Sequence, residues 1–301
     1  MPSNEQRREA AKRKLERQIT RRAERARRRR TIGVVVTVVA VVVVVGGVYF
    51  LVTSGHSSNT AAAANPSSSA APTTTAAAGK PTSGPCKYTT TPSQPAPSGK
   101  NVGVPADPSP TPKTGTVTVD LKTSQGDVPV TMDRAEAPCT VQSFLHLVQT
   151  KFYDNTPCHR MTNYENPPLD VLQCGDPTGT GSGGPGYTIP DEKPKTLKPA
   201  PTTTPAQAGS EASVIYPAGT IAMANTGQAN TGGSQFFLVY KDSYLPADYT
   251  VFGTITPAGL ATVNKIAAGG ITPGSDPSTG QATPNDGAPK LKVTITQAVN
   301  S

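Results

Sequence analysis

Alternating apolar and polar residues mark the start of the part of this chain that has the pattern of a folded domain. From Thr116 to Thr123, the sequence TVTVDLKT places apolar residues at alternate positions, as a half-buried strand requires. Gly126-Asp127 then predicts a hairpin turn, and residues 128–132 predict the strand that pairs with the first. The folded domain is therefore expected to begin with a β-hairpin, near Thr114.

Two later segments have the periodicity of helices. Across residues 138–148, apolar residues that start at Val141 follow the i, i+3, i+4, i+7 spacing of an amphipathic helix. A second, shorter helix is predicted over residues 260–266. Further short strands are expected at 171–173, 220–223, 235–239, 250–253 and 291–295. Two helices among about eight short antiparallel strands predict a mainly β fold, and closing the sheet into a β-barrel would leave no exposed edge strands.

The N-terminal end of the chain differs in charge from the predicted domain. The first 30 residues hold 13 Lys or Arg and four Glu, a net charge of +9, whereas the whole chain carries only +8. The basic charge therefore belongs to a tail at residues 1–31, and it gives no indication of a nucleic-acid surface on the folded part. We accordingly expect no nucleic acid among the partners.

An uncharged apolar run, Ile32–Val52, follows the basic tail directly. Its 21 residues are enough to span a hydrocarbon core of about 30 Å as a helix, which satisfies its own backbone hydrogen bonds. Because basic residues precede the run and none follows closely, we expect a cytoplasmic N-terminus and a domain outside the cell membrane. The alternative is a cleaved signal peptide, whose apolar core would be shorter, roughly 7–15 residues. The small residues Ala61–Ala64 leave room for such cleavage.

Residues 53–113 consist mainly of Ala, Ser, Thr, Pro and Gly. Such a segment cannot bury enough apolar surface to offset the entropy lost on ordering, which predicts a disordered linker ahead of a domain at 114–301. Lys87-Tyr88 is the exception, because a disulfide from the adjacent Cys86 could hold it on the domain. Residues 193–212 are rich in Pro and Thr and predict a surface insertion.

Four cysteines, Cys86, Cys139, Cys158 and Cys174, follow the apolar run. In an oxidising compartment they can form two disulfides, in any of three pairings. They contain no C-x-x-C pair, and the three histidines are far apart in the sequence, so no metal site is expected. No cofactor is expected either.

A glycine-rich stretch, Gly175–Tyr187 (GDPTGTGSGGPGY), contains the G-x-G-x-x-G spacing of a dinucleotide-binding turn. Such a turn needs a strand before it and a helix after it, because the phosphate binds at the helix N-terminus. Here Pro185, Gly186 and Pro190 follow, and they do not favour a helix. A nucleotide site is therefore rejected, and the glycines need another explanation.

The order of several motifs resembles the cyclophilin-type peptidyl-prolyl isomerases. These motifs are His159-Arg160, Gln173 to Asp176, the glycine-rich stretch, Met223-Ala224-Asn225, Gly233 to Phe237 (GSQFF) and Val251-Phe252-Gly253. The resemblance covers roughly residues 114–298 and, with the N-terminal anchor, is similar to the membrane-anchored cyclophilins of actinobacteria. It implies a closed, eight-stranded antiparallel β-barrel capped by two helices, with the glycines shaping the rim of the substrate groove.

The resemblance also implies the residues of the active site. Arg160 matches the catalytic arginine, and Gln173 matches the glutamine that orients this arginine and the peptide carbonyl. Phe237 matches the floor of the proline pocket, whereas its neighbour Phe236 should point into the barrel core. The other substrate-binding positions are Val171, Ala224, Asn225, Gln235, Tyr244, Leu245 and Tyr249.

The sequence departs from the family pattern near the groove. Between Arg160 and Gln173 it has five residues more than the usual spacing. Asp170 stands where many members have phenylalanine, so this wall of the pocket is thinner unless Leu169 fills it. Tyr244 stands in place of the tryptophan of eukaryotic members.

Within the family arrangement, Cys158 and Cys174 flank two neighbouring antiparallel strands. We therefore expect a disulfide between them, which leaves Cys86 to pair with Cys139.

Together these features predict a monomeric peptidyl-prolyl cis–trans isomerase on the outer face of the cell membrane. Its substrates would be proline-containing peptides and unfolded secreted or cell-wall proteins. Catalysis would be non-covalent, with Arg160 stabilising the twisted X–Pro amide against a barrier of about 18–20 kcal/mol. The alternative is a membrane-anchored module that binds proline-containing peptides with little or no turnover, which the change at Asp170 favours.

Overall fold

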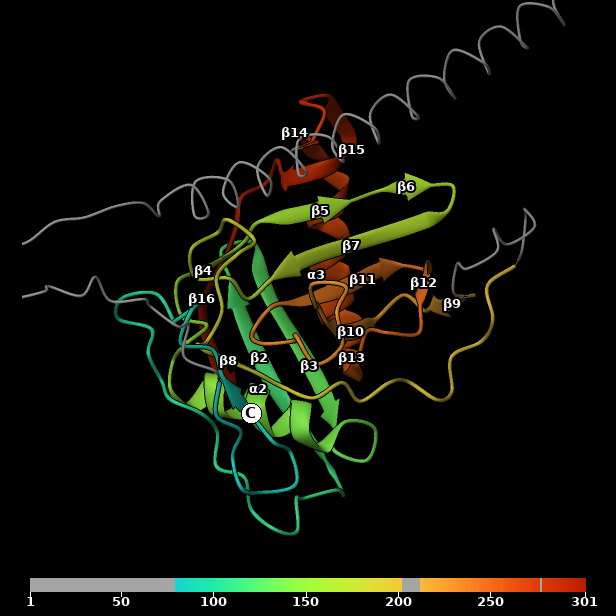
Figure 1. Cartoon of the computed structure of the whole chain (residues 1–301). Helices are drawn as coiled ribbons and strands as arrows, with labels where there is room; N and C mark the ends of the chain where they lie inside the picture. The colour runs from blue at the N-terminus through green and yellow to red at the C-terminus, as the bar shows by residue number, and fades with distance from the viewer. Residues whose placement is uncertain (1–78, 202–211, 277) are drawn as a thin grey trace, which may run out of the picture. The chain divides into compact units, whose positions relative to one another are not determined.

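The computed structural model describes residues 79–201, 212–276 and 278–301, which are coloured in Figure 1. The expected basic tail 1–31, the transmembrane helix Ile32–Val52 and the first part of the linker lie outside these residues. Neither helix within the described ranges is long and apolar enough to cross a bilayer.

The described part of the chain is mainly β, with two helices, as the sequence predicted. The helices are α2 (Pro138–Gln149) and α3 (Pro257–Ala268). The strands are β1 (Thr89–Thr90), β2 (Thr116–Thr123), β3 (Gly126–Asp133), β4 (Thr156–Cys158), β5 (Arg160–Thr162), β6 (Tyr164–Glu165), β7 (Pro168–Cys174), β8 (Tyr187–Thr188), β9 (Ser213–Tyr216), β10 (Thr220–Met223), β11 (Phe236–Lys241), β12 (Ser243–Pro246), β13 (Val251–Ile255), β14 (Ile271–Ser275), β15 (Ala282–Pro289) and β16 (Val293–Asn300).

One large antiparallel sheet, in the order β14-β15-β5-β7-β11-β10-β13-β3-β2-β16-β4, forms the body of the domain. Its hydrogen-bonded path is open, so the sheet is a half-barrel and the prediction of a closed, eight-stranded barrel is wrong. His159 separates the consecutive strands β4 and β5, and these two strands do not pair with the same neighbours. β4 pairs with β16 at one end of the path, whereas β5 pairs with β7 and β15.

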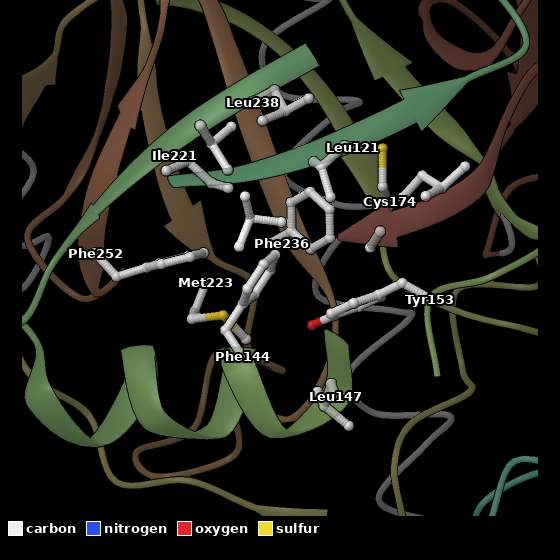
Figure 2. Packing of buried hydrophobic residues seen from close by; sticks show 14 of the residues in the cluster. Leu121, Phe144, Leu147, Tyr153, Cys174, Ile221, Met223, Phe236, Leu238 and Phe252 are labelled. Carbon is white, nitrogen blue, oxygen red and sulfur yellow. The ribbon is translucent and has the colours of Figure 1, made fainter. Parts of the chain in front are cut away.

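Aromatic side chains fill the core between helix α2 and the sheet. Phe144 of α2 lies 5.4 Å from Phe236 of β11 and 5.2 Å from Phe252 of β13, measured between ring centroids. Tyr153, which follows α2, lies 4.9 Å from Phe144, and Figure 2 shows these four rings converging. Tilted and edge-to-face contacts of this kind add to the stabilisation that comes from burying the rings. The core therefore fixes the backbone of β11 and β13 from one side of the sheet.

The start of helix α2 is capped by a side chain from a distant part of the chain. The Glu192 carboxylate accepts hydrogen bonds from the backbone N–H groups of Cys139 (3.0 Å) and Thr140 (2.8 Å). It thereby satisfies donors that a helix start leaves free, and its negative charge complements the helix dipole. This contact fixes the segment after β8 to the helix.

Residues 79–113, which we call the strap, lie along the domain. The expected disordered linker therefore does not extend to residue 113. β1 pairs with β8, and Cys86 is bonded to Cys139, as the sequence analysis expected. Tyr88 is fully buried, and its hydroxyl donates to the Cys139 carbonyl at 2.8 Å. The composition of the strap does not predict this ordered structure, because only a few anchoring residues hold a segment that is otherwise poor in apolar side chains.

Loss of the strap disulfide is expected to destabilise the fold. Cys86 and Cys139 are separated by 53 positions in the sequence, and closing a loop of that length restricts the unfolded chain. In the full chain, Cys86→Ser combined with Cys139→Ser should lower the free energy of unfolding by about 2–4 kcal/mol. Urea titrations measure this change, and an unchanged midpoint at an unchanged slope would contradict it.

Candidate active site

Strand β11 directs its two phenylalanines to opposite faces of the sheet. Phe236 is fully buried in the main core, whereas Phe237 belongs to a second apolar cluster. Alternation of side chains along a strand produces this separation. The expectation that Phe236 points into the core is confirmed.

The second cluster, which we call the Phe237 cluster, brings together five of the predicted site residues. Its buried members are Val171, Tyr216, Ala222, Phe237 and Val239, and Leu169, Leu197, Val214, Ala224, Leu245, Tyr249 and Val251 pack against them. Phe237 meets Tyr249 edge to face, with ring centroids 5.5 Å apart. Tyr244 is not a member, because it neighbours Leu245 on β12 and adjacent strand residues point to opposite sides.

Tyr216 is a member of this cluster that no sequence motif revealed. It ends β9, which pairs with β12 through Tyr216↔Ser243 and Val214↔Leu245. Its hydroxyl lies 3.0 Å from the Pro246 carbonyl and 3.1 Å from the Tyr249 carbonyl, to which it can donate. The segment that follows the Pro/Thr-rich insertion therefore supports the β12 wall of the cluster.

Strand register places Arg160, Gln173 and Phe237 in one row across three neighbouring strands. Arg160 of β5 pairs with Gln173 of β7, which in turn pairs with Phe237 of β11. Paired residues of an antiparallel sheet point to the same face, and neighbouring strands lie about 4.8 Å apart. The guanidinium of Arg160 therefore lies on the same face as the apolar Phe237 cluster.

Hydrogen bonds connect this row to the glycine-rich stretch. Arg160 Nη1 donates to Gln173 Oε1 (3.1 Å), and Gln173 Nε2 donates to Gln235 Oε1 (2.9 Å). Gln235 Nε2 in turn lies 2.9 Å from the carbonyl oxygens of both Gly181 and Gly183. In each glutamine the side-chain oxygen thus accepts a hydrogen bond and the side-chain nitrogen donates one. This fixes the orientation of the Gln173 amide, with its oxygen toward Arg160.

Asp286 of β15 is a neighbour of Arg160 that the sequence analysis missed. Its two carboxylate oxygens accept from Arg160 Nε and Nη2, each at 2.7 Å. This bidentate bond raises the pKa of Arg160 further, so the guanidinium stays charged. The two residues are 126 positions apart in the sequence, and no motif links them.

The ring of His159, next to Arg160, lies beneath the glycine-rich stretch. A side chain at Gly181 would come within 3.6 Å of His159 Nε2. Burial lowers the pKa of His159 from its usual value, although the nearby Asp176 opposes this shift. The ring is therefore neutral near pH 7 and adds no second positive charge beside the guanidinium.

The glycine-rich stretch wraps around the buried carboxylate of Asp176. Asp176 Oδ1 accepts from the Thr178 backbone N–H and hydroxyl, both at 2.7 Å, and Oδ2 accepts from the Gly181 N–H at 2.6 Å. A Cβ atom at Gly183 would lie only 2.0 Å from Asp176 Oδ1, so only glycine fits there. These glycines therefore pack around an internal carboxylate, which explains them without a phosphate.

A cavity of about 810 Å³ lies beside Gln173 and Gln235. Ala224 and Asn225 also line it, so four of the predicted site residues border the cavity together with the glycine-rich stretch. The strap adds a wall with Thr91, Gln94, Pro95 and Pro97. None of the described residues that line the cavity is charged, and its polar side chains are the amides and hydroxyls of Gln, Asn, Thr, Ser and Tyr.

The structure accounts for the departures from the family pattern between Arg160 and Gln173. Leu169 packs against the Phe237 cluster, whereas the Asp170 side chain points to the other side of β7. The Asp170 backbone N–H donates to the Ser243 hydroxyl at 2.8 Å. Tyr164 of β6 pairs with Leu169 of β7, so the extra residues lengthen the hairpin between β5 and β7. Leu169 thus stands at the wall that Asp170 leaves open.

A second disulfide closes the other end of this hairpin. Cys158 and Cys174 are bonded, with Cα atoms 4.0 Å apart, as the sequence analysis expected. The bond links β4 to the end of β7 and flanks the Arg160–Gln173 pair. Among the described residues, no three His, Cys, Asp or Glu side chains gather as a metal site would require.

The buried Asp176 carboxylate is expected to give a pH-dependent contribution to stability. Burial alone would raise its pKa, but the hydrogen bonds from Thr178, Gly181 and Gly183 outweigh burial and hold the pKa below its usual range. Because the folded pKa is depressed, this stabilisation is present above about pH 4 and is lost as the pH falls through the folded pKa.

The substitution Asp176→Asn should therefore destabilise the full chain by about 2 kcal/mol at pH 7 and by less at pH 3. Urea titrations of both proteins at the two pH values provide the measurement. A difference that stays constant with pH would refute the assigned role of the carboxylate.

The sequence of this chain is similar to those of known proteins. Residues 118–300 match the family model described as cyclophilin type peptidyl-prolyl cis-trans isomerase/CLD. The probable peptidyl-prolyl cis-trans isomerase B of Mycobacterium leprae is 48% identical over 192 residues, which are 64% of this chain and 57% of that protein. Its counterpart in Mycobacterium tuberculosis is 42% identical over 217 residues, which are 71% of this chain and 63% of that protein. The matches thus span less than two thirds of these relatives.

Shorter relatives match over most of their length. A peptidyl-prolyl cis-trans isomerase of Helicobacter pylori is 35% identical over 153 residues, which are 50% of this chain and 80% of that protein. The crystal structure of a cyclophilin type peptidyl-prolyl cis-trans isomerase of Cryptosporidium parvum has a TM-score of 0.44 and 26% identity, covering 62% of this chain and 98% of its own. With a family model matched over more than half of its length, this chain belongs to the cyclophilin-type peptidyl-prolyl cis–trans isomerases.

Proposed function

We propose that this chain is an enzyme that accelerates the cis–trans isomerisation of X–Pro bonds in proline-containing peptides. The observation that carries the proposal is the row formed by Arg160, Gln173 and Phe237 on three paired strands. It places a fixed cation beside an apolar cluster on one face of the sheet. A reaction that only rotates a bond needs a binding surface and an oriented donor, and this row supplies both.

The Phe237 cluster would hold the proline ring. Phe237 and Tyr249 meet edge to face at 5.5 Å, and Leu245 and Ala224 pack against the same cluster. Apolar contacts of this kind bind the planar and the twisted amide equally well, because the ring itself does not change during rotation. The cluster therefore contributes mainly to affinity, which lowers KM without raising kcat.

Arg160 would act on the amide nitrogen. An X–Pro bond resists rotation by about 18–20 kcal/mol, because the C–N bond has partial double-bond character. When the bond twists, the lone pair of the prolyl nitrogen becomes localised and can accept a hydrogen bond. A guanidinium N–H that is held beside this nitrogen stabilises the twisted state more than the planar state, which accelerates the rotation.

The domain would work outside the cytoplasm, on unfolded secreted or cell-wall proteins, as a monomer held to the membrane by Ile32–Val52. The two disulfides, Cys86–Cys139 and Cys158–Cys174, support this location, because such bonds persist in oxidising compartments. The basic residues ahead of the apolar run support a cytoplasmic N-terminus.

Removing Arg160 should separate catalysis from binding. In the full chain, Arg160→Ala is expected to lower kcat/KM for an Ala-Pro peptide roughly 100-fold, since a preorganised donor in a transition state has an effect of that size. The peptide affinity should change little, and Arg134→Ala, which removes an arginine outside the row, should leave the rate unchanged. A protease-coupled isomerisation assay and calorimetric titration measure the two quantities.

The opposite outcomes of this experiment are also informative. If the folded wild-type chain binds the peptide but shows no rate above the uncatalysed one, the chain is a proline-peptide binding module. A rate that survives in Arg160→Ala would refute the role proposed for the arginine.

The proposed location predicts how intact cells respond to external protease. Cells that express the full chain with an epitope on each end should lose the C-terminal epitope and keep the N-terminal one. A protected C-terminal epitope would contradict the extracytoplasmic location. Release of the domain into the medium, together with a shortened N-terminus, would instead identify a cleaved signal peptide.

A further inference from the structure

We infer that Asp286 is a positioning residue for Arg160, delivered by the hairpin of β14 and β15; the inference rests on the proposed isomerase function. The carboxylate binds Arg160 Nε and Nη2 with two bonds of 2.7 Å each. It would act on catalysis through the guanidinium, without contact with the substrate.

The donors of Arg160 are divided between two protein partners and the substrate. A guanidinium has five N–H groups in one plane. Asp286 takes one on Nε and one on Nη2, and Gln173 takes one on Nη1 at 3.1 Å. Partners at both ends of the group fix the plane in which it lies. One N–H remains on each terminal nitrogen, and these are the donors available to a prolyl nitrogen or a peptide carbonyl.

The hairpin that carries Asp286 is itself attached to the strand of Arg160. β15 pairs with β5 through Asp286↔Thr162 and Gly287↔Met161. The Asn163 backbone N–H donates to the Asn285 carbonyl at 3.1 Å. The carboxylate thus comes from a paired strand, which holds it more rigidly than a free loop would.

Close packing inside the hairpin depends on the residue after Asp286. A Cβ atom at Gly287 would lie 2.1 Å from the Thr272 carbonyl oxygen of β14. Glycine at this position lets β14 approach β15 and keeps Asp286 in register with the strand of Arg160. The Thr283 hydroxyl adds a further bond, of 2.7 Å, to the Asp286 carbonyl.

The ion pair is more enclosed than an ordinary surface pair. The Arg160 side chain is 40% exposed and that of Asp286 22% exposed. Fully exposed ion pairs are screened by water and contribute little. This pair has bidentate geometry and partial burial, both of which favour one orientation of a side chain that would otherwise sample many rotamers. The carboxylate binds the edge of the guanidinium formed by Nε and Nη2, so one N–H on each terminal nitrogen stays open.

A double-mutant cycle tests the inference in the full chain. Asp286→Ala is expected to lower kcat for an Ala-Pro peptide about tenfold and to leave KM within about twofold, because a misplaced donor affects the twisted state most. Asp286→Glu should restore part of the rate. In the Arg160→Ala background, Asp286→Ala should cause no further loss.

One control variant and two contrary outcomes separate this role from a structural one. The substitution Asp276→Ala, at the turn of the same hairpin, should leave kcat unchanged. The Asp276 carboxylate accepts from the backbone N–H groups of Ser278 and Thr279, so its loss removes no partner of Arg160. An equal loss from Asp286→Ala in both backgrounds would show that Asp286 only supports the fold. An unchanged or higher kcat in Asp286→Ala would overturn the inference directly.

A wild-type chain without turnover would refute the proposed function alone. A spectroscopic measurement would then still test whether Asp286 holds the Arg160 guanidinium. The Arg160 Nε–H should give a slowly exchanging NMR signal in the wild type, and this signal should broaden or vanish in Asp286→Ala. A signal that exchanges rapidly in the wild type, or that persists in the variant, would show that Asp286 does not hold the guanidinium.

Discussion

Alternation of side chains along β7 and β11 is the constraint on which the rest of the site depends. On one face, Leu172 and Phe236 close the main core; on the other, Gln173 and Phe237 stand in the row with Arg160. A shift of one residue in either strand would exchange the two faces, losing the core and the site together. The packing that stabilises the domain therefore also fixes the register of its functional residues.

The same row explains how a positive charge is held beside an apolar cluster. Arg160 has Gln173 on one side and Asp286 on the other, while the neighbouring His159 is kept neutral by burial. Gln173 is oriented in turn by Gln235, whose amide is held by the glycine-rich stretch. A polar group near an apolar surface is tolerated when its donors are satisfied. Here Gln173 and Asp286 accept from three N–H groups of Arg160 and leave the other two open to the substrate.

Local patterns predicted both helices and several of the strands. The candidate site residues came from the resemblance to a family, and the features that were missed depend on long-range contacts. The alternation at Thr116–Thr123 and the helical spacing from Val141 correspond to β2 and α2. In contrast, the strap looks disordered by composition, because its order comes from a disulfide and a strand pairing that no local pattern contains. Asp286 and Tyr216 reach the site through pairings of β15 and β9 with distant strands, which carry no motif.

The roles of Arg160 and the Phe237 cluster are tested most directly by the rate at which a bound peptide interconverts between its cis and trans forms. NMR exchange spectroscopy on an Ala-Pro peptide gives this rate separately from the affinity, in the wild type and in Arg160→Lys. Lysine keeps the charge but loses the planar fork of donors. In Arg160→Lys we expect an affinity within about twofold of wild type and a bound-state rate at least about tenfold lower. An unchanged rate, or a rate and an affinity that fall together, would contradict the division of roles between Arg160 and the Phe237 cluster.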